Sequence, residues 1–415
     1  MLRRLKESFF VRRVMKTAWY CRVRRHFPGS EDCSRDDRGQ IENAEMVGID
    51  WPASLPRPRV GVVRDLEPYP RWTKYCRFLQ KNGFEHDIYD IHAHDWLQRA
   101  GGFDVIIGIW SCELHHLQEL REKYWFLENY LGKSTYPSAA HALLYEDKKL
   151  EAYIANSCGI PFAKTHISHD CQDALRMVAG LSYPALSKIV PGSGSIGVEL
   201  VSNAAHARRI VHQAFSWGGR KTHVNYARQK GYVYFQDFIP NDGYDIRVIV
   251  VGDLVFGYYR KVPAGDFRAS GMNLVEKRDL PRRAMAIALE LNRAVRSPML
   301  VVDMVRDREG DFHVIEFSPV CQVETPEQLH VHDKPGAYHF DEDGNWRFEP
   351  GRYWVHELAL REFLLADYIP KVGRGGNGDQ HWTPNVEHRT PKDAKGAEAA
   401  EVEREVVGQS KSLPR

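Results

Sequence analysis

Two carboxylates on neighbouring apolar segments give the strongest chemical signal in this sequence. The runs MLVVDMVRD and DFHVIEFS have the composition of strands, and a turn centred on Glu309 and Gly310 would join them into a hairpin. In that register Asp303 lies opposite Glu316, with both side chains on one face. Adjacent carboxylates on a buried sheet repel each other and lose hydration unless a cation neutralises them. Carboxylate oxygens suit Mg2+ or Mn2+, so the pair is a candidate site for either ion.

Two alternatives stay open for this hairpin. A register shift of one residue would separate the carboxylates, because it moves side chains to the other face. Two solvated acids on a partly exposed hairpin would also need no ion. Ser318 follows Glu316 by two residues and therefore points to the same face.

A glycine-rich segment, YPALSKIVPGSGSIGVELV, offers a second kind of chemistry. Gly192, Gly194 and Gly197 have the spacing G-x-G-x-x-G, which occurs in dinucleotide-binding folds, in kinase loops and by chance. The residues after Gly197 alternate like a short strand, so we expect strand, loop, strand. Such a tip lets backbone N–H groups approach phosphate, and Lys188 on the incoming strand could reach the same oxygens. The alternative is a flexible hairpin with a surface lysine.

A third segment supplies cations for phosphate. The run YDIRVIVVGDLVFGYYRKVPAGDFRAS places Asp245, Arg247, Arg260, Lys261 and Arg268 in and after a second predicted hairpin. Arginine can grip phosphate oxygens in a bidentate manner, and a triphosphate needs several such charges. Any one arginine is an ordinary surface charge, but their position beside a carboxylate pair and a glycine hairpin favours phosphate binding.

The composition is that of a globular protein of two or three domains. The chain has 415 residues, 43% of them hydrophobic and 27% charged, and its net charge of +2 indicates no nucleic-acid partner. Its longest apolar runs have the length of strands, well short of the roughly 20 residues of a membrane helix. Seven cysteines lie scattered without C-x-x-C spacing, which favours reduced thiols and a cytoplasmic location.

We expect four segments along the chain. Residues 1–56 are a basic and polar extension, and nine Lys or Arg against one acid in its first 27 residues could give weak contact with a membrane surface. A targeting sequence and a loose basic extension are the alternatives. Residues 57–136 alternate strand and helix like an α/β domain with parallel strands. Residues 137–369 have an α+β pattern and end in an amphipathic helix expected to dock on that domain, and residues 370–415 are polar and expected to be disordered.

Four histidines have spacings found in some zinc sites. They form the pairs His92 and His94, and His115 and His116. This spacing is a weak signal, and we predict no metal site from it.

The order and content of these motifs resemble the ATP-grasp superfamily, and within it the RimK-like branch of carboxylate-amine ligases, the ribosomal-protein glutamate ligases. The resemblance covers roughly residues 137–320. DKKL is similar to the family's helix-opening Asp-Lys, SKIVPGSGSIGVELV to its lysine strand and flexible loop, and YFQDFIP to its hinge strand. YDIRVIVVG and GDFRAS resemble its ribose and phosphate segments, and VVDMV and VIEFSP its metal strands. The resemblance implies an ATP-grasp fold whose subdomains, about 147–235 and 236–369, grip ATP between them.

The resemblance also implies a role for each matching residue. Arg247 would contact the reacting groups, and Arg268 the triphosphate. The implied metal ligands are Asp303, Glu316 and Ser318, with the serine in place of the family's asparagine. The implied ATP-binding residues, with Asp237 in place of the usual hinge glutamate, are Lys148, Lys188, Gly194, Ser195, Gly197, Gln236, Asp237, Phe238, Ile239, Asp245 and Arg268.

The implied reaction is ATP-dependent formation of an amide or peptide bond. A substrate carboxylate attacks the γ-phosphate to give an acylphosphate and ADP, and an amine then displaces phosphate. The partners would be small-molecule or peptide carboxylates and amines. Because Ser318 departs from the family pattern, two alternatives stay open. One is an ATP-binding protein without ligase activity, such as a regulator or assembly factor, and the other is an ATP-grasp phosphotransferase.

Overall fold

The fold was examined in a computed structural model of the chain. The residues that it describes are 41–65, 69–190, 192, 197–222, 227–263, 274–341 and 343–373. The predictions for Gly194, Ser195 and Arg268, and for the two ends of the chain, therefore lie outside the described residues. Among the described helices, none has both the length and the hydrophobicity that a membrane span requires.

The N-terminal domain is a four-stranded parallel sheet, as the alternating pattern predicted. The strand order is β2-β1-β3-β4, and every pair is parallel. The strands β1, β3 and β4 are fully buried, which fits their continuous apolar runs. The elements are β1 (Val60–Val62), α5 (Trp72–Lys81), β2 (His86–Ile88), α6 (Trp96–Ala100), β3 (Val105–Ile107), α7 (Leu114–Asn129) and β4 (Ser134–Tyr136).

A second sheet carries the glycine-rich segment. Its order is β5-β10-β6-β7, and the pairing of Lys188 with Val198 confirms the predicted strand, loop, strand arrangement. Two helices, α10 and α11, pack their apolar residues on one face of this sheet. The elements of this region are α8 (Ala139–Leu144), α9 (Lys148–Ser157), β5 (Thr165–Ser168), α10 (Cys171–Ala179), β6 (Ala185–Lys188), β7 (Val198–Val201), α11 (Ala204–Ala214), β8 (Arg220–Lys221), β9 (Arg228–Gln229) and β10 (Val233–Asp237).

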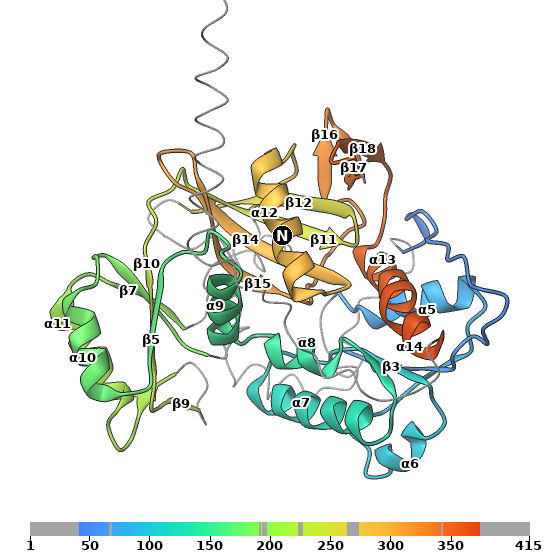
Figure 1. The fold of residues 1–415 in the computed structure, drawn as a ribbon, viewed down its shortest axis with the longest axis horizontal. Helices are drawn as coiled ribbons and strands as arrows, with labels where there is room; N and C mark the ends of the chain where they lie inside the picture. Colours follow the sequence, from blue (N-terminus) through green and yellow to red (C-terminus); the bar gives the residue numbers. More distant parts are fainter. Residues whose placement is uncertain are drawn as a thin grey trace, which may run out of the picture. The chain divides into compact units, whose positions relative to one another are not determined.

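The third sheet is the largest and lies at the centre of Figure 1. Its main path runs β15-β14-β11-β12-β17-β16, and β13 and β18 pair with β12 and β17. The long predicted hairpin and the predicted helix over RRAMAIALELNRAV are both present. The elements are β11 (Tyr244–Val251), β12 (Leu254–Lys261), β13 (Val275–Glu276), α12 (Arg282–Val295), β14 (Met299–Arg306), β15 (Phe312–Ser318), β16 (Leu329–Val331), β17 (Lys334–Phe340) and β18 (Trp346–Pro350).

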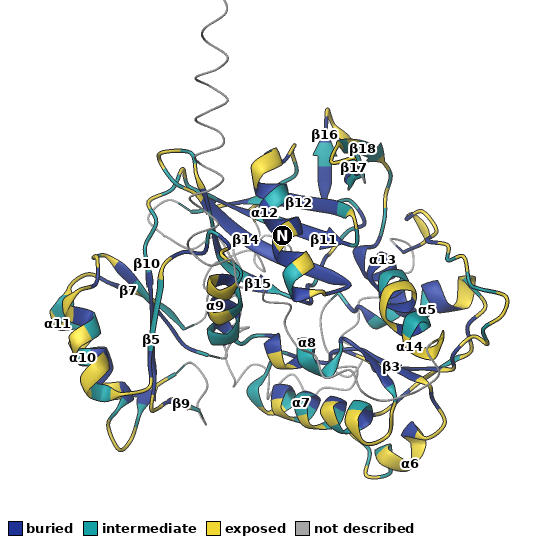
Figure 2. Ribbon diagram, viewed as in Figure 1, coloured by how far each residue is buried: buried dark blue, intermediate teal, exposed yellow. Residues whose placement is uncertain are grey.

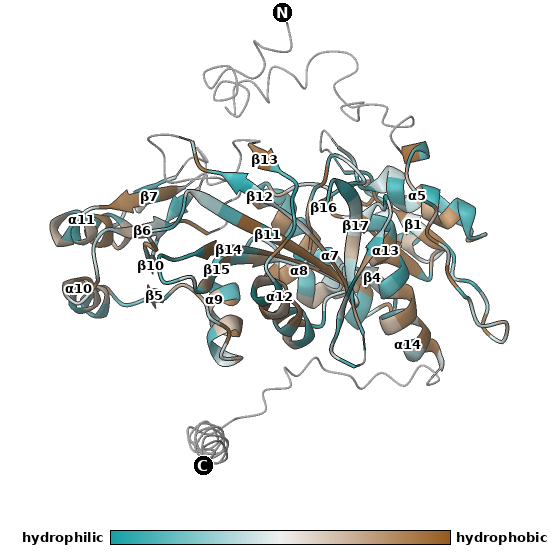
Figure 3. Cartoon of the chain, turned by 90° about the horizontal axis from the view of Figure 1, so that it is seen from above, coloured by the Kyte–Doolittle hydropathy of each residue, from teal (hydrophilic) through white to brown (hydrophobic). Residues whose placement is uncertain are grey.

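The two faces of this sheet have different environments. Val248 and Val302 point to the face that α12 covers, in one apolar cluster with that helix. On the opposite face, Val251 and Val301 pack with Val62 of the N-terminal sheet. Because side chains alternate, the other ends of β11 and β14 present their charged residues on that same opposite face. Figure 2 shows these strands to be largely buried, and Figure 3 shows the hydrophobic residues that run along them.

The carboxylate hairpin has the predicted register only in its half distant from the turn. Asp303 pairs with Glu316 as expected, but the register shifts beyond this pair, so that Met304 pairs with Val314. This difference from the predicted register has a local cause. Residues 307–311 form a five-residue loop, in which the Asp307 N–H donates to the Asp311 carbonyl and the Asp311 N–H donates to Asp307 Oδ1. The shift leaves Ile315 as an extra residue, a β-bulge.

The last helices also differ from the expectation. They are α13 (Val355–Glu362), the π-helix η1 (Phe363–Tyr368) and α14 (Ile369–Gly373). We expected this segment to dock on the second domain, but it packs on both domains. It contacts α5 as well as β11, and its apolar residues share one cluster with both sheets (Figure 1). The helix therefore helps to hold the N-terminal sheet against the large sheet.

Candidate active site

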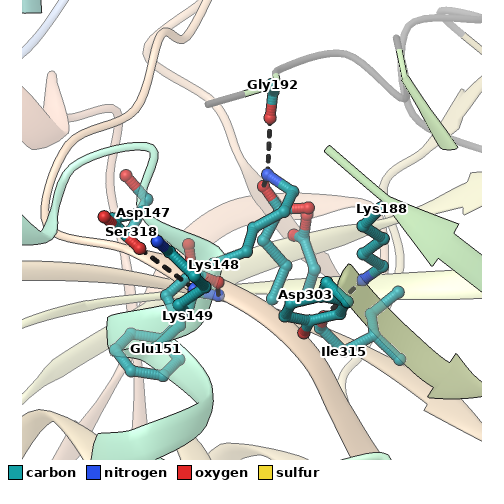
Figure 4. Close-up of polar contacts among 12 residues, drawn as sticks. Asp147, Lys148, Lys149, Glu151, Lys188, Gly192, Asp303, Ile315 and Ser318 are labelled. Atoms are coloured by element: carbon teal, nitrogen blue, oxygen red, sulfur yellow. Dashed lines mark hydrogen bonds and ion pairs between the residues drawn. The ribbon is translucent and has the colours of Figure 1, made fainter. Parts of the chain in front are cut away.

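Helix α9 delivers a lysine into the centre of the site. Asp147 caps this helix, since its Oδ1 accepts hydrogen bonds from the backbone N–H groups of Lys149 (3.1 Å) and Leu150 (3.2 Å). The next residue, Lys148, is buried, and its Nζ donates to the Gly192 carbonyl at 2.5 Å and to Glu316 Oε1 at 2.8 Å (Figure 4). The cap thus fixes where the helix begins, and Lys148 is the first residue of that helix.

A second lysine reaches the same place from β6. Lys188 is buried at the end of that strand, and its Nζ donates to the Ile315 carbonyl at 3.0 Å. Ile315 is the bulge residue, so the register shift in the carboxylate hairpin supplies this acceptor. Burial, with some help from the charge of Lys148, lowers the pKa of Lys188 to about 8, although Glu316 acts against this shift.

The carboxylate of Asp303 is held by two arginines. Arg247 binds both of its oxygens at 2.8 Å, and Arg260 approaches Oδ2 at 2.8 Å. Burial alone would raise the pKa of Asp303, but the two guanidinium groups outweigh it and hold that pKa well below the usual range. Arg260 also binds Asp245 at 2.6 and 2.8 Å, yet burial leaves the pKa of Asp245 raised.

The opposite carboxylate is held by lysines. Burial would raise the pKa of Glu316, but Lys148 and Lys188 overcome this and lower it. Burial likewise would lower the pKa of Lys148, whereas Glu316 and its acidic neighbours raise it above the usual value. Glu151, one turn along α9, accepts a hydrogen bond from the Phe317 N–H at 3.1 Å, and burial raises its pKa well above the usual range. No motif in the sequence singled out Glu151.

These groups form one charge network with a small positive excess. Among the described residues of the network, four cations face three carboxylates whose ion pairs are described above. Burial disfavours the charged form of Glu151 and raises its pKa. The lysines and arginines of the network now pair only with its own carboxylates. A bound polyanion would stabilise them further, since its oxygens can accept hydrogen bonds from several of these cations together. The network therefore suits a phosphate-bearing ligand.

A pocket between the second and third sheets gathers most of these side chains. Its wall on one side comes from α9, β6 and β10, and on the other from β11, β12, β14 and β15. The predicted site residues that line it are Lys148, Lys188, Gln236, Asp237, Phe238, Ile239, Asp245, Asp303 and Glu316, together with Gly192, Arg260 and Ile315.

The same part of the chain matches a known family. Residues 140–332 match the family described as the RimK-like ATP-grasp domain. This segment of the chain is therefore similar to RimK-like ATP-grasp domains. The match includes both lysines and both carboxylates at the centre of the pocket.

The curated relatives that the chain resembles are named as ligases. A probable alpha-L-glutamate ligase of Haemophilus influenzae is 28% identical over 190 residues, which are 44% of this chain and 59% of the relative. The alpha-aminoadipate–LysW ligase LysX of Saccharolobus solfataricus is 24% identical over 265 residues, 60% of this chain and 90% of the relative. The chain thus spans 59% of the length of the glutamate ligase.

Solved structures include similar chains. A RimK domain ATP-grasp protein from Sphaerobacter thermophilus has a TM-score of 0.44 at 18% identity, covering 62% of this chain and 90% of that one. The D-alanine–D-alanine ligase of Bacillus anthracis has a TM-score of 0.46 at 18% identity, covering 63% and 86%.

The predicted hinge residues lie along one edge of the pocket. Strand β10 ends at Asp237, and Phe238 and Ile239 continue along the pocket wall. The buried Gln236 donates from Nε2 to Thr165 Oγ1 at 3.1 Å, while its Oε1 is buried without a hydrogen-bond partner. The residue that replaces the usual glutamate, Asp237, pairs with His166 at 3.3 Å.

Three of the predicted site residues that the structure describes are not among those that line the pocket. The side chain of Arg247 contacts Asp303 and does not line the pocket. The hydroxyl of Ser318 donates to the Val320 carbonyl at 2.8 Å, so its hydrogen bond is to its own loop. Gly197 directly precedes β7 and has φ +85°, a conformation that other residues rarely adopt. Arg260, which the sequence suggested only as a phosphate cation, is the residue that links Asp245 with Asp303.

Proposed function

We propose that this protein is an ATP-dependent carboxylate-amine ligase. It would activate a carboxylate as an acylphosphate and form an amide or peptide bond with release of ADP and phosphate. The observation that carries the proposal is the buried pocket in which Lys148 and Lys188 converge on the carboxylate of Glu316, opposite Asp303. The RimK-like match over these residues and the ligase names of the relatives support the same reaction class.

The binding of ATP would exchange one set of ion pairs for another. In the structure Lys148 donates to Glu316 and to a backbone carbonyl, and Lys188 donates to another backbone carbonyl. Phosphate oxygens carry more charge than a carbonyl and would draw both ammonium groups toward the nucleotide. The resemblance adds Arg268 for the triphosphate, Gly194, Ser195 and Gly197 for the covering loop, and Gln236 to Ile239 for the adenine, with Asp245 at the ribose.

The same exchange would expose a site for Mg2+ or Mn2+. Asp303 and Glu316 lie opposite each other on neighbouring strands, and two carboxylates with the phosphates of a nucleotide are a common ligand set for Mg2+. Each carboxylate is stabilised as an anion, because the pKa values of both are held below the usual range. The ion would supply positive charge that stabilises the transferring phosphoryl group. Ser318 is the weakest of the proposed ligands, since its hydroxyl is bonded to Val320.

The protein's own residues would perform three tasks in this reaction. Lys148 and Lys188 would hold the phosphates in place and stabilise charge that develops on them. Arg247, held in a fixed orientation by two bonds to Asp303, would orient the reacting groups. The glycine-rich segment would close over the phosphates and exclude water, which would otherwise hydrolyse the acylphosphate. An amine then completes the reaction without a nucleophile from the protein.

The test is a screen of carboxylate and amine pairs that measures ADP release by the purified full-length chain. The proposal expects release to require both substrates, and mass spectrometry to find a product joined by an amide. Lys188→Met should reduce this turnover at least about 100-fold, the usual effect of removing one transition-state contact, and Lys230→Met, which changes an exposed lysine, should not. ATP binding without turnover on any pair would favour the binding protein, and phosphorylation of a hydroxyl or histidine the phosphotransferase.

A further inference from the structure

A cluster of histidine and glutamate side chains lies at the start of α7, in the N-terminal domain. Glu113, His115 and His116 each offer a ligand atom, and these three atoms lie within 4.8 Å of one another. In the part of the chain that the structure describes, no other group of three His, Cys, Asp or Glu side chains has this spacing. None of the three lines the nucleotide pocket, so the cluster is separate from the proposed ligase site.

The local fold explains why these side chains meet. Strand β3 ends at Ile107, and the chain then turns at Ser111, whose Oγ accepts a hydrogen bond from the Glu113 N–H at 3.0 Å. Glu113 is the N-cap of α7, and His116 is the third residue of the helix. An N-cap side chain and a side chain three positions later face each other across the first turn. The rings of His115 and His116 have centroids 4.0 Å apart.

A further histidine approaches from the loop after β2. The ring centroid of His92 lies 5.8 Å from that of His116, and its Nδ1 lies 2.9 Å from Glu119 Oε2. A carboxylate can only accept, so in the neutral ring the proton sits on Nδ1 and the lone pair on Nε2. A carboxylate that fixes a histidine in this way is the common partner of metal-binding histidines. The edge contact with Trp110, at 5.0 Å between ring centroids, further restrains His92.

A buried ring nitrogen of the cluster also favours a cation. The Nδ1 of His116 is buried and lacks a hydrogen-bond partner, which is costly without a ligand. The positive end of the helix dipole opposes a cation here, and the carboxylates of Glu113 and Glu119 offset that effect.

We propose that Glu113, His115 and His116, with His92 as the fourth ligand, form a Zn2+ site. Two or more imidazoles with a carboxylate are a ligand set of zinc proteins, and four ligands complete its tetrahedral geometry. Softer sulfur ligands are not needed for this ion. The site joins the loop after β2 to the start of α7 at the carboxyl edge of the parallel sheet. Bound Zn2+ therefore stabilises the N-terminal domain, whatever the reaction in the pocket.

The first experiment titrates the purified full-length chain with Zn2+ by calorimetry, in excess Mg2+ so that the nucleotide site does not compete. We expect one Zn2+ per chain. The double variant His115→Asn/His116→Asn should weaken binding at least about 100-fold, and Glu119→Gln, which removes the partner of His92, about tenfold. His94→Asn, an exposed histidine near the same loop, is the matched control and should bind like the parent.

A second measurement guards against misfolded variants. Zn2+ should raise the melting temperature of the parent and of His94→Asn, and leave that of the double variant unchanged. With Co2+ in place of Zn2+, the parent should give the visible absorption of a four-coordinate site, and His92→Asn should lose it. Zn2+ affinity in a folded double variant equal to that of the parent, or the absence of stoichiometric binding to the parent, overturns the proposal. An unchanged Co2+ spectrum in His92→Asn removes this histidine from the ligand set.

Discussion

Replacing either carboxylate of the central pair should stop turnover, but only Asp303→Asn should also destabilise the fold. Asp303 has an 8% exposed side chain and is held by Arg247 and Arg260, with three N···O distances of 2.8 Å. The asparagine would leave the buried Arg260 and the partly buried Arg247 with one carboxylate, Asp245, between them. Breaking a buried ion pair from one side costs about 3–5 kcal/mol.

Glu316→Gln is the matched comparison. The side chain of Glu316 is 35% exposed, and its partner Lys148 keeps its hydrogen bond to the Gly192 carbonyl when the charge is removed. Lys148 itself is buried, but the Gly192 carbonyl and the glutamine oxygen can still accept from it, so we expect a loss of about 1 kcal/mol. The two substitutions therefore remove the same charge from the proposed metal site but differ in stability by about 2–4 kcal/mol.

The assay combines equilibrium unfolding in urea with ADP release at saturating ATP. The midpoint should fall sharply for Asp303→Asn and little for Glu316→Gln, with similar slopes. Both variants should lose at least about 100-fold in turnover under conditions where they are folded, because each lacks one charged ligand of the proposed ion. Equal unfolding midpoints would refute the reasoning about the arginines. Turnover like that of the parent in both variants would refute the metal site.

Three further predictions concern the loop, the serine and pH. Replacing Gly194 and Gly197 by Val should raise the KM for ATP, because Gly197 has φ +85° and β-branched residues avoid that conformation. Steady-state kinetics would measure this KM. An unchanged ATP affinity would mean that the loop does not cover phosphate. Ser318→Asn should lower the Mg2+ concentration that gives half-maximal ADP release. Ser318→Ala should lose less activity than Glu316→Gln, because water can replace a neutral ligand. A larger loss of activity in Ser318→Ala than in Glu316→Gln, measured in Mg2+ titrations, would contradict this prediction. Burial raises the pKa of Glu357 from 4.5 to about 7. The protonated side chain therefore stabilises the fold by about 3 kcal/mol below pH 4.5, and this contribution is lost as the pH rises through 7. The stability of Glu357→Gln relative to the parent should therefore increase over that range, and parallel stability curves would speak against it.

Sequence patterns determined the local elements and much of the candidate site. The helices and hairpins after residue 147 follow from periodicity and capping, as at Asp147, because these depend on residues a few positions apart. The pairing of Asp303 with Glu316 was predicted from a two-residue turn, and it is present because the β-bulge at Ile315 offsets the five-residue loop. The parallel direction of the N-terminal strands also followed, since helices separate them in the sequence.

Only the tertiary structure decided which distant groups share a charge network. The bulge at Ile315 offers its carbonyl to Lys188, 127 positions away, and no local pattern specifies a contact of that span. The role of Arg260 as the link between two aspartates depends on three strands lying side by side in the sheet. The histidines of α7 illustrate the same limit, because His92 and His116 lie on separate elements and their spacing in the sequence carries little information. Their rings meet only because the parallel sheet brings its loops together at one edge.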